Sequence, residues 1–288
     1  MKDGNAISKR ACVAFVVVGL MMFMAKSEAR IDPKSLMGMW LLNENKGDVV
    51  RDSSGNGHDG NFVNDVKWTE GKFGKAIVFN GESHLDHGAL PTLNVGLGNF
   101  SLVAWIKTSG DPPDWHAAII HKAVWPAPRH GYLLCVRGKL DPGRIGLPLL
   151  WVGLGTDAGV HLFGTQPIND GKWHHLGGTV DRKTSMKLYV DGEFNAEGNI
   201  TQYVKENEDN TSKFYIGGEQ GRSHVIERAI DEVAVFNTVL TDADLKEVYQ
   251  KGLEYALGIT AVSPSGKLAI TWGGLRKAEG ERRKAEGK

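Results

Sequence analysis

The sequence has only two cysteines, Cys12 and Cys135, and no excess of charge of either sign. Its 34 basic and 34 acidic residues lack the positive excess that nucleic-acid binding needs, so we expect no nucleic-acid partner. Proline is also scarce, with 10 residues against 37 glycines and no Gly-X-Y repeat, which excludes a collagen-like chain. This composition is typical of a folded protein whose glycines lie in tight turns between short strands.

Long apolar runs are absent except at residues 11–25. Basic residues precede this run, and Ser27-Glu28-Ala29 supplies small side chains before a cut in front of Arg30. This layout is that of a secretory signal peptide, and the run is short for a membrane span. We therefore predict a cleaved signal peptide over residues 1–29, a secreted, periplasmic or cell-surface location, and no membrane span after cleavage. An uncleaved signal anchor is the alternative.

Cleavage changes the cysteine and charge counts. Removal of residues 1–29 takes away four basic and two acidic residues, which leaves 30 basic and 32 acidic ones. It also removes Cys12, so no disulfide can form within the mature chain. Cys135 lies in the apolar segment 132–136, which favours a buried structural thiol over a nucleophile. Stability must then come from a hydrophobic core.

From Arg30 onward, the chain consists of short strand-like segments separated by Gly, Asn and Asp turns. Residues 186–190 alternate apolar and other side chains, and Asp191-Gly192 follows at once, which predicts a hairpin. The clearest predicted strands are 35–42, 75–79, 100–108, 117–122, 131–136, 145–152, 174–180, 186–190, 214–217 and 230–236. Many strands without helix–strand alternation predict an all-β, antiparallel β-sandwich.

One short helix is predicted near the C-terminal end. Thr241 is the expected N-cap, Asp244 completes a capping box, and Gly252 stops the helix. Leu240 and Leu245 are spaced as a hydrophobic staple.

The last segments of the chain have a different composition. Residues 258–275 form an extension in which 267–272 offers one more strand. Residues 276–288 repeat Lys-Ala-Glu-Gly and carry no aliphatic side chain larger than alanine. Such a segment cannot bury enough apolar area to fold alone, so we predict a flexible charged tail.

An ordered series of landmarks resembles the laminin-G-like domains of the concanavalin A-like lectin/glucanase superfamily. The landmarks are the segments 38–44, 50–60, 71–81, 100–107, 170–175, 188–192, 215–218 and 230–240. They include the loop Asp52-Ser-Ser-Gly-Asn56 and the strand Ile230-Asp-Glu-Val233. The resemblance covers about residues 36–249 and implies a jelly-roll β-sandwich over residues 30–257.

The loop that begins at Asp52 predicts a structural calcium site. Asp52, Ser54 and Asn56 occupy alternate positions, as in the first half of an EF-hand loop, but the bidentate glutamate at the twelfth position is missing. The resemblance implies that Asp231 supplies a further carboxylate, and its strand parity predicts that it faces the interior. These oxygen donors suit Ca²⁺ as a cofactor. Simple Asx and Ser turns, with Asp231 facing solvent, are the alternative.

Glycosidases occur on the same fold and need two carboxylates that flank the scissile bond. Glucanases of this superfamily carry them on one strand as E-x-D-x-x-E or E-x-D-x-E, and this sequence has neither run. Asp231 and Glu232 are adjacent, so an extended strand directs them to opposite faces. We therefore predict a binding module without enzymatic activity, and a glycoside hydrolase is the less favoured alternative.

Aromatic and basic side chains gather in residues 111–132. The candidate ligand-binding residues are Trp115, His116, Trp125, Arg129 and His130. Exposed aromatic rings stack on sugar rings, so we predict binding to extracellular or cell-surface glycans. Alternatively, the two tryptophans pin a long loop to the sheet. A protein-binding adhesion or scaffold module is the alternative function on this fold. Nothing in the sequence indicates the oligomeric state.

Overall fold

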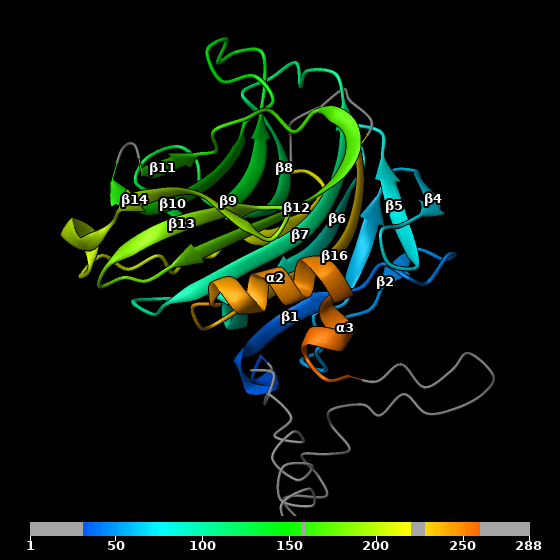
Figure 1. Ribbon diagram of the computed structural model, residues 1–288, viewed down its shortest axis with the longest axis horizontal. Helices are drawn as coiled ribbons and strands as arrows, with labels where there is room; N and C mark the ends of the chain where they lie inside the picture. Colours follow the sequence, from blue (N-terminus) through cyan, green and yellow to red (C-terminus); the bar gives the residue numbers. More distant parts are fainter. Residues whose placement is uncertain (1–30, 157–158, 220–227, 260–288) are drawn as a thin grey trace, which may run out of the picture. The chain divides into compact units, whose positions relative to one another are not determined.

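Two antiparallel sheets face each other in the computed structural model, which describes residues 31–156, 159–219 and 228–259 (Figure 1). Sheet A has the strand order β14-β13-β12-β7-β16-β5-β4, and β1 also pairs with β16. Sheet B has the order β11-β10-β9-β8-β15-β6-β3-β2. The predicted jelly-roll β-sandwich is therefore confirmed.

The strands of sheet A are β1 (Leu36–Trp40), β4 (Val66–Glu70), β5 (Lys75–Phe79), β7 (Phe100–Ser109), β12 (Asp170–Val180), β13 (Ser185–Val190), β14 (Glu193–Asn199) and β16 (Arg228–Phe236). Those of sheet B are β2 (Val49–Val50), β3 (Gly60–Val63), β6 (His84–Ala89), β8 (His116–Ala123), β9 (Arg129–Arg137), β10 (Pro148–Thr156), β11 (Val160–Phe163) and β15 (Lys213–Ile216). The helices are α2 (Asp242–Lys251) and α3 (Leu253–Ala256), and single 3-10 turns span η1 (Pro33–Ser35), η2 (Pro91–Leu93) and η3 (Thr201–Tyr203).

The main hydrophobic core lies between the two sheets. It follows from the alternation of each strand, because every second side chain faces the opposite sheet. Leu102, Ala104 and Ile106 of β7 belong to it, as do Leu134 of β9 and Val152 of β10. All five are at most 1% exposed, so stability rests on this core without a disulfide.

The predicted hairpin is confirmed between β13 and β14, where Val190 pairs with Glu193. Asp191 and Gly192 both have left-handed backbones, with φ of 53° and 76°. Two successive residues with positive φ form the tight turn that matches the twist of paired strands, and aspartate and glycine tolerate it best.

The predicted helix is α2, and its capping box is present. Thr241 Oγ1 accepts from Asp244 N at 3.2 Å, while Asp244 Oδ2 accepts from Thr241 N at 2.9 Å. Leu240 and Leu245 belong to one apolar cluster with Val103 and Phe236 on the outer side of sheet A. The helices therefore cover part of the face of sheet A that points away from sheet B, beside β1 and β16 (Figure 1).

A β-bulge in β16 connects this sheet to the helices. The pairing of β16 with β7 shifts between Asp231 and Ala234, and Glu232 takes the unusual φ of 45°. Its carboxylate Oε2 accepts from Leu253 N, at the start of α3, at 3.0 Å. The bulge thus aims a buried side chain at a helix N-terminus that needs an acceptor.

Several predictions concern residues outside the described ranges. They are the signal peptide over 1–29, the strand at 267–272 and the charged tail at 276–288. Among the described residues, no helix is both long and apolar enough to cross a membrane.

Candidate functional site

The outer face of sheet B carries the candidate site. Strands β8, β9, β10 and β11 are consecutive neighbours in this sheet, each paired with the next. Their outward side chains form a small apolar cluster of their own, separate from the core between the sheets. Its buried members are Ala118, Ala123, Leu133, Cys135, Leu149 and Trp151. No described helix packs on this cluster, and long side chains cover it instead.

The predicted burial of Cys135 is confirmed within this cluster. Burial raises the pKa of its thiol, which keeps the reactive thiolate form from accumulating. Cys135 is therefore part of the floor beneath the site.

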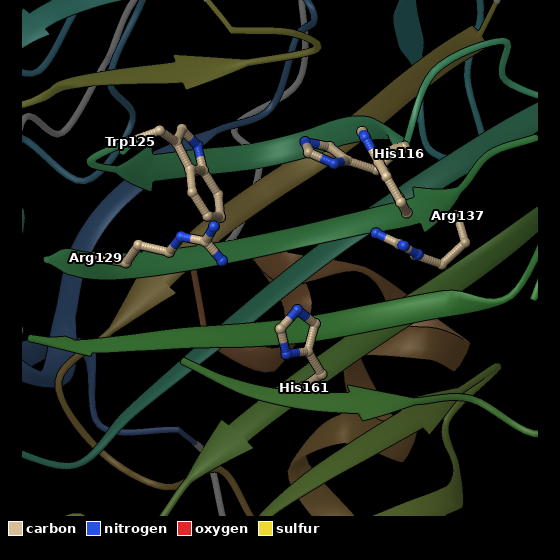
Figure 2. Close-up of a pocket in the computed structure, with 6 residues that line it drawn as sticks. His116, Trp125, Arg129, Arg137 and His161 are labelled. Atoms are coloured by element: carbon tan, nitrogen blue, oxygen red, sulfur yellow. The ribbon is translucent and has the colours of Figure 1, made fainter. Parts of the chain in front are cut away.

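Six side chains line a groove above this floor, with a cavity volume of about 340 Å³. They are Trp115, His116, Trp125, Arg129, Arg137 and His161. We call this cavity the sheet B groove. Figure 2 shows Trp125 and Arg129 together at one end, His116 and Arg137 toward the other, and His161 reaching in from β11. Such a volume is that of a site for a small ligand or one part of a larger one.

Trp125 is fixed on three sides. Its ring lies 4.6 Å from the ring of Trp151 in the groove floor. The guanidinium carbon of Arg129 lies 5.0 Å from the centre of the same indole, a cation–π distance. Its Nε1 lies 3.2 Å from His121 Nε2. The indole is thus held in one orientation at the groove.

Glu219 lies behind this tryptophan and is almost completely buried. Its carboxylate oxygens are 2.8 Å from His121 Nε2 and 3.8 Å from His116 Nε2. Burial alone would raise the pKa of Glu219, but the two neighbouring histidines hold it well below its ordinary value. Glu219 therefore acts as an ionised anchor for His116 in the groove and for His121 behind Trp125.

Arg137 and Trp115 form the other end of the groove. Trp115 is 48% exposed, and the Arg137 guanidinium carbon lies 5.6 Å from its ring centre. Arg137 also donates to Asp141 Oδ2 at 2.8 Å, and Arg144 approaches the same oxygen at 3.2 Å. Despite burial, these bonds hold the pKa of Asp141 below its usual range. One carboxylate thus serves two guanidinium groups.

Four of the five predicted ligand residues meet in this groove, and His130 does not. His130 Nδ1 contacts Asn207 O at 3.0 Å instead. The reason is strand parity: Arg129 and Arg137 share the outward face of β9, whereas His130 has the opposite parity. The same parity could have identified Arg137 from the sequence. His161 was beyond sequence reasoning, since β11 was not predicted.

Asp52 makes contacts of a different kind. Its Oδ1 accepts from Met39 N at 3.1 Å and Ser54 N at 2.9 Å, and its Oδ2 accepts from His58 N at 3.0 Å. The Asn56 amide donates to the carbonyl of Met37 at 2.9 Å. These hydrogen bonds are those of Asx and Ser turns, which are the predicted alternative to a calcium site. Calcium binding at this loop stays a prediction.

Asp231 is buried, but on the other side of sheet A from the one that we predicted. Because of the bulge, Ile230 and Val233 both face the core between the sheets, while Asp231 pairs with Trp105 on the outer side. Its Oδ2 accepts from Phe73 N at 2.9 Å. Burial raises the pKa of Asp231 to about 7. No hydrogen bond between the described residues joins Asp231 to the Asp52 loop.

The described residues contain no group of three or more His, Cys, Asp or Glu side chains able to hold a metal ion. Serine and asparagine oxygens, which the predicted calcium site requires, do not belong to that class of ligands. The chemistry of the sheet B groove is that of aromatic rings and nitrogen donors.

The chain belongs to the concanavalin A-like lectin/glucanases superfamily, whose laminin-G family model matches residues 80–246, more than half of its length. This confirms the resemblance. A search of curated proteins found no match.

Three solved structures illustrate the likeness. The binding domain of Paraclostridial mosquitocidal protein 1 has a TM-score of 0.60 at 15% identity, over 75% of this chain and 52% of that one. Domain 4 of AbnA, an extracellular GH43 arabinanase from Geobacillus stearothermophilus in complex with arabinotriose, has a TM-score of 0.56 at 20% identity, over 75% and 98%. The botulinum neurotoxin serotype D ligand-binding domain with N-acetylneuraminic acid has a TM-score of 0.55 at 17% identity, over 76% and 51%.

This chain thus spans about half the length of the two toxin domains and nearly all of the arabinanase domain. At such identities the likeness establishes the fold, which is one used by binding domains.

Proposed function

We propose that the protein is a secreted, non-catalytic binding module that holds carbohydrate in the sheet B groove. The observation that carries the proposal is the arrangement of Trp115 and Trp125 in one groove with arginine and histidine side chains. Indole faces stack on the apolar faces of sugar rings, and guanidinium and imidazole N–H groups bind hydroxyl oxygens. Both kinds of contact are needed to fix a sugar in one orientation.

The fold relatives support this proposal by analogy. The arabinanase domain was solved with arabinotriose, and the serotype D domain with N-acetylneuraminic acid. Both ligands are carbohydrates. A surface glycan is therefore a reasonable partner class for a module of the same fold.

The absence of catalysis is supported by the groove's lining. Its six residues include no carboxylate, whereas glycoside hydrolysis uses a pair of them across the scissile bond. Asp231 and Glu232 are not among the lining residues, and their carboxylates accept hydrogen bonds from Phe73 N and Leu253 N. Incubation of the purified protein with glycans should release no reducing ends. Release that is lost in Glu232→Gln would contradict the proposal.

A glycan array followed by calorimetry tests the binding. Trp115→Ala and Trp125→Ala should each weaken binding of the best array ligand by about tenfold or more, because each removes a stacking surface from a small site. Phe194→Ala is the matched control, since Phe194 is 53% exposed and lies on β14 of sheet A, outside the groove.

Unchanged affinity in both tryptophan variants, with thermal melting intact, would contradict the proposed site. A surface protein captured in a manner that sugars do not inhibit would instead favour the adhesion alternative. Export is tested separately: N-terminal sequencing of the secreted protein should begin at Arg30, and a sequence beginning at Met1 would contradict cleavage.

A further inference from the structure

The sheet B groove has an uneven charge. Its lining contains two guanidinium groups, Arg129 and Arg137, two imidazoles and two indoles, and no acidic side chain. Neutral sugars need a balance of hydrogen-bond donors and acceptors, because each hydroxyl both donates and accepts. This groove offers donors at both ends and no carboxylate acceptor among its six lining residues.

Arg129 has no ion-pair or hydrogen-bond partner among the described residues for its side chain. Its Nε is buried and makes no hydrogen bond to a described residue, and its guanidinium carbon lies 5.0 Å from the centre of the Trp125 ring. Leaving a charged donor without a partner at a partly buried position is unfavourable. The group is directed into the groove beside Trp125 (Figure 2), where a ligand can reach it.

Arg137 and Arg144 are different from Arg129 because both bind Asp141. That single carboxylate faces two guanidinium groups, so it compensates one of the two positive charges. Glu219, another acid beside the groove, is engaged by His116 and His121. Among the six lining residues of the described structure, the two guanidinium groups face no lining carboxylate.

The pKa of His161, which lines the same groove, is affected by this positive charge. Burial lowers its pKa, and the positive charges of Arg137, Arg129 and Arg144 lower it further. Three guanidinium groups therefore act on the same point in the groove. The field there favours an anion and disfavours a second cation.

We propose that the ligand of the sheet B groove is an acidic glycan, whose carboxylate or sulfate group pairs with Arg129 while its sugar ring stacks on Trp125. This inference rests on the proposed function and specifies its substrate class. A planar guanidinium group can bind either anion through two parallel hydrogen bonds, so the recognised chemistry is the shared negative oxygen pair.

Calorimetry with paired oligosaccharides tests the inference on the whole secreted protein. One pair is an oligogalacturonate and its methyl ester, in which a methyl group replaces the charge of each carboxylate. The other pair is a sulfated galactan oligosaccharide and its desulfated counterpart. We expect at least one acidic member to bind roughly tenfold tighter than its neutral partner, in line with a charge-assisted hydrogen bond. The pair that shows the difference identifies the anion.

Arg129→Gln should bring the ratio of acidic to neutral affinity close to one, while Arg129→Lys should retain part of the preference. Arg51→Gln is the matched control, because it removes the same charge from a side chain that is 71% exposed and outside the groove lining. A salt titration of wild type gives a second measurement: affinity for the acidic member should fall with ionic strength, and affinity for the neutral one should not.

Equal binding of acidic and neutral members by wild type would overturn the inference and leave the proposed function standing. An acid preference that persists undiminished in Arg129→Gln would also overturn it. Failure of the protein to bind any glycan, neutral or acidic, would overturn the proposed function and the inference together.

Discussion

The outer faces of the two sheets are built from the same strand alternation but are covered in opposite ways. On sheet A, α2 and α3 pack on an apolar surface that includes Val103 and Phe236, and we call this the helix-covered face. On sheet B, a smaller apolar patch is covered by the tryptophan and arginine side chains of the groove. A helix fills its contact surface completely, whereas separate long side chains leave a cavity between them.

Glycine positions reinforce this difference. A Cβ on Gly177 of β12 would come within 2.8 Å of Leu245, so the helix lies directly on the backbone of sheet A. On sheet B, a Cβ on Gly153 would meet the ring of Trp151 at 2.3 Å. Close approach therefore serves helix packing on one face and the placement of an aromatic floor on the other. The comparison predicts that stability depends on the first face and binding on the second.

The largest effect is expected for Leu245→Ala on the helix-covered face. Leu245 is fully buried against Gly177, and truncation leaves a cavity that the helix cannot close. We expect the free energy of unfolding to fall by about 3 kcal/mol, measured by urea denaturation. Glycan affinity should be unchanged below the unfolding transition. A loss of affinity in the folded variant would contradict the prediction that stability depends on the helix-covered face and binding on the groove face.

Calcium removal is the next effect in size. If the Asp52 loop and Asp231 share an ion, the stabilisation is about 2.7 kcal/mol at a hundredfold excess of calcium over Kd. Wild type should then melt several degrees lower in EGTA than in millimolar calcium, and Asp231→Asn should show no response to calcium. Equal melting temperatures of wild type in the two buffers would leave the loop with its turn hydrogen bonds alone.

Acid should weaken the helix-covered face through His175. Its ring contacts Trp105 and Tyr249, neither ring nitrogen has a hydrogen-bond partner among the described residues, and burial lowers its pKa to about 4. The unfolded chain binds a proton near the ordinary value of about 6.5, so this contribution to stability is present above pH 6.5 and is lost as pH falls toward 4.

At pH 5 the loss attributable to His175 should be about 2 kcal/mol. His175→Phe keeps a ring in the same place and should remove this part of the pH dependence, measured by denaturation between pH 7 and 5. Some dependence will persist, because burial also lowers the pKa of His87 to about 4. An unchanged pH profile in His175→Phe would show that His175 becomes protonated without cost.

The smallest effect on stability is expected for Trp115→Ala on the groove face. With 48% of its surface already exposed, Trp115 contributes little to the folded state, and the free energy of unfolding should change by less than about 0.5 kcal/mol. The same variant should bind the glycan about tenfold or more weakly. A destabilisation as large as that of Leu245→Ala would favour the interpretation that this tryptophan pins the loop to the sheet.

Much of this architecture could be predicted from the sequence because its strands are strongly apolar. The predicted segments at 75–79 and 100–108 correspond to β5 and β7. The predicted capping residues of α2 also give both ends of that helix correctly. The strands that escaped prediction carry polar residues or are short: β6 contains His84 and Asp86, and β11 has four residues. Weak alternation gives such edge and polar strands no distinctive pattern.

Most of the site residues that were predicted correctly lie close together along the chain. Trp115, His116, Trp125 and Arg129 lie within one segment, but His161 reaches the groove through the pairing of β10 with β11. Asp231 shows a second limit. One extra residue in a β-bulge changes the face of the sheet to which the preceding side chains of the strand point, and no residue type predicts a bulge reliably. Long-range pairing and bulges are properties of the folded sheet that local sequence does not encode.

The order of strands in sheet B also bears on how this binding surface can diversify. Because β8 to β11 form a continuous meander, all six lining residues fall between positions 115 and 161. The helix-covered face instead joins residues from Ile31 to Leu257, drawn from both ends of the described chain. Grafting the 115–161 segment between relatives of this fold should therefore exchange ligand preference as a unit, while the anchoring of the helices stays with the recipient.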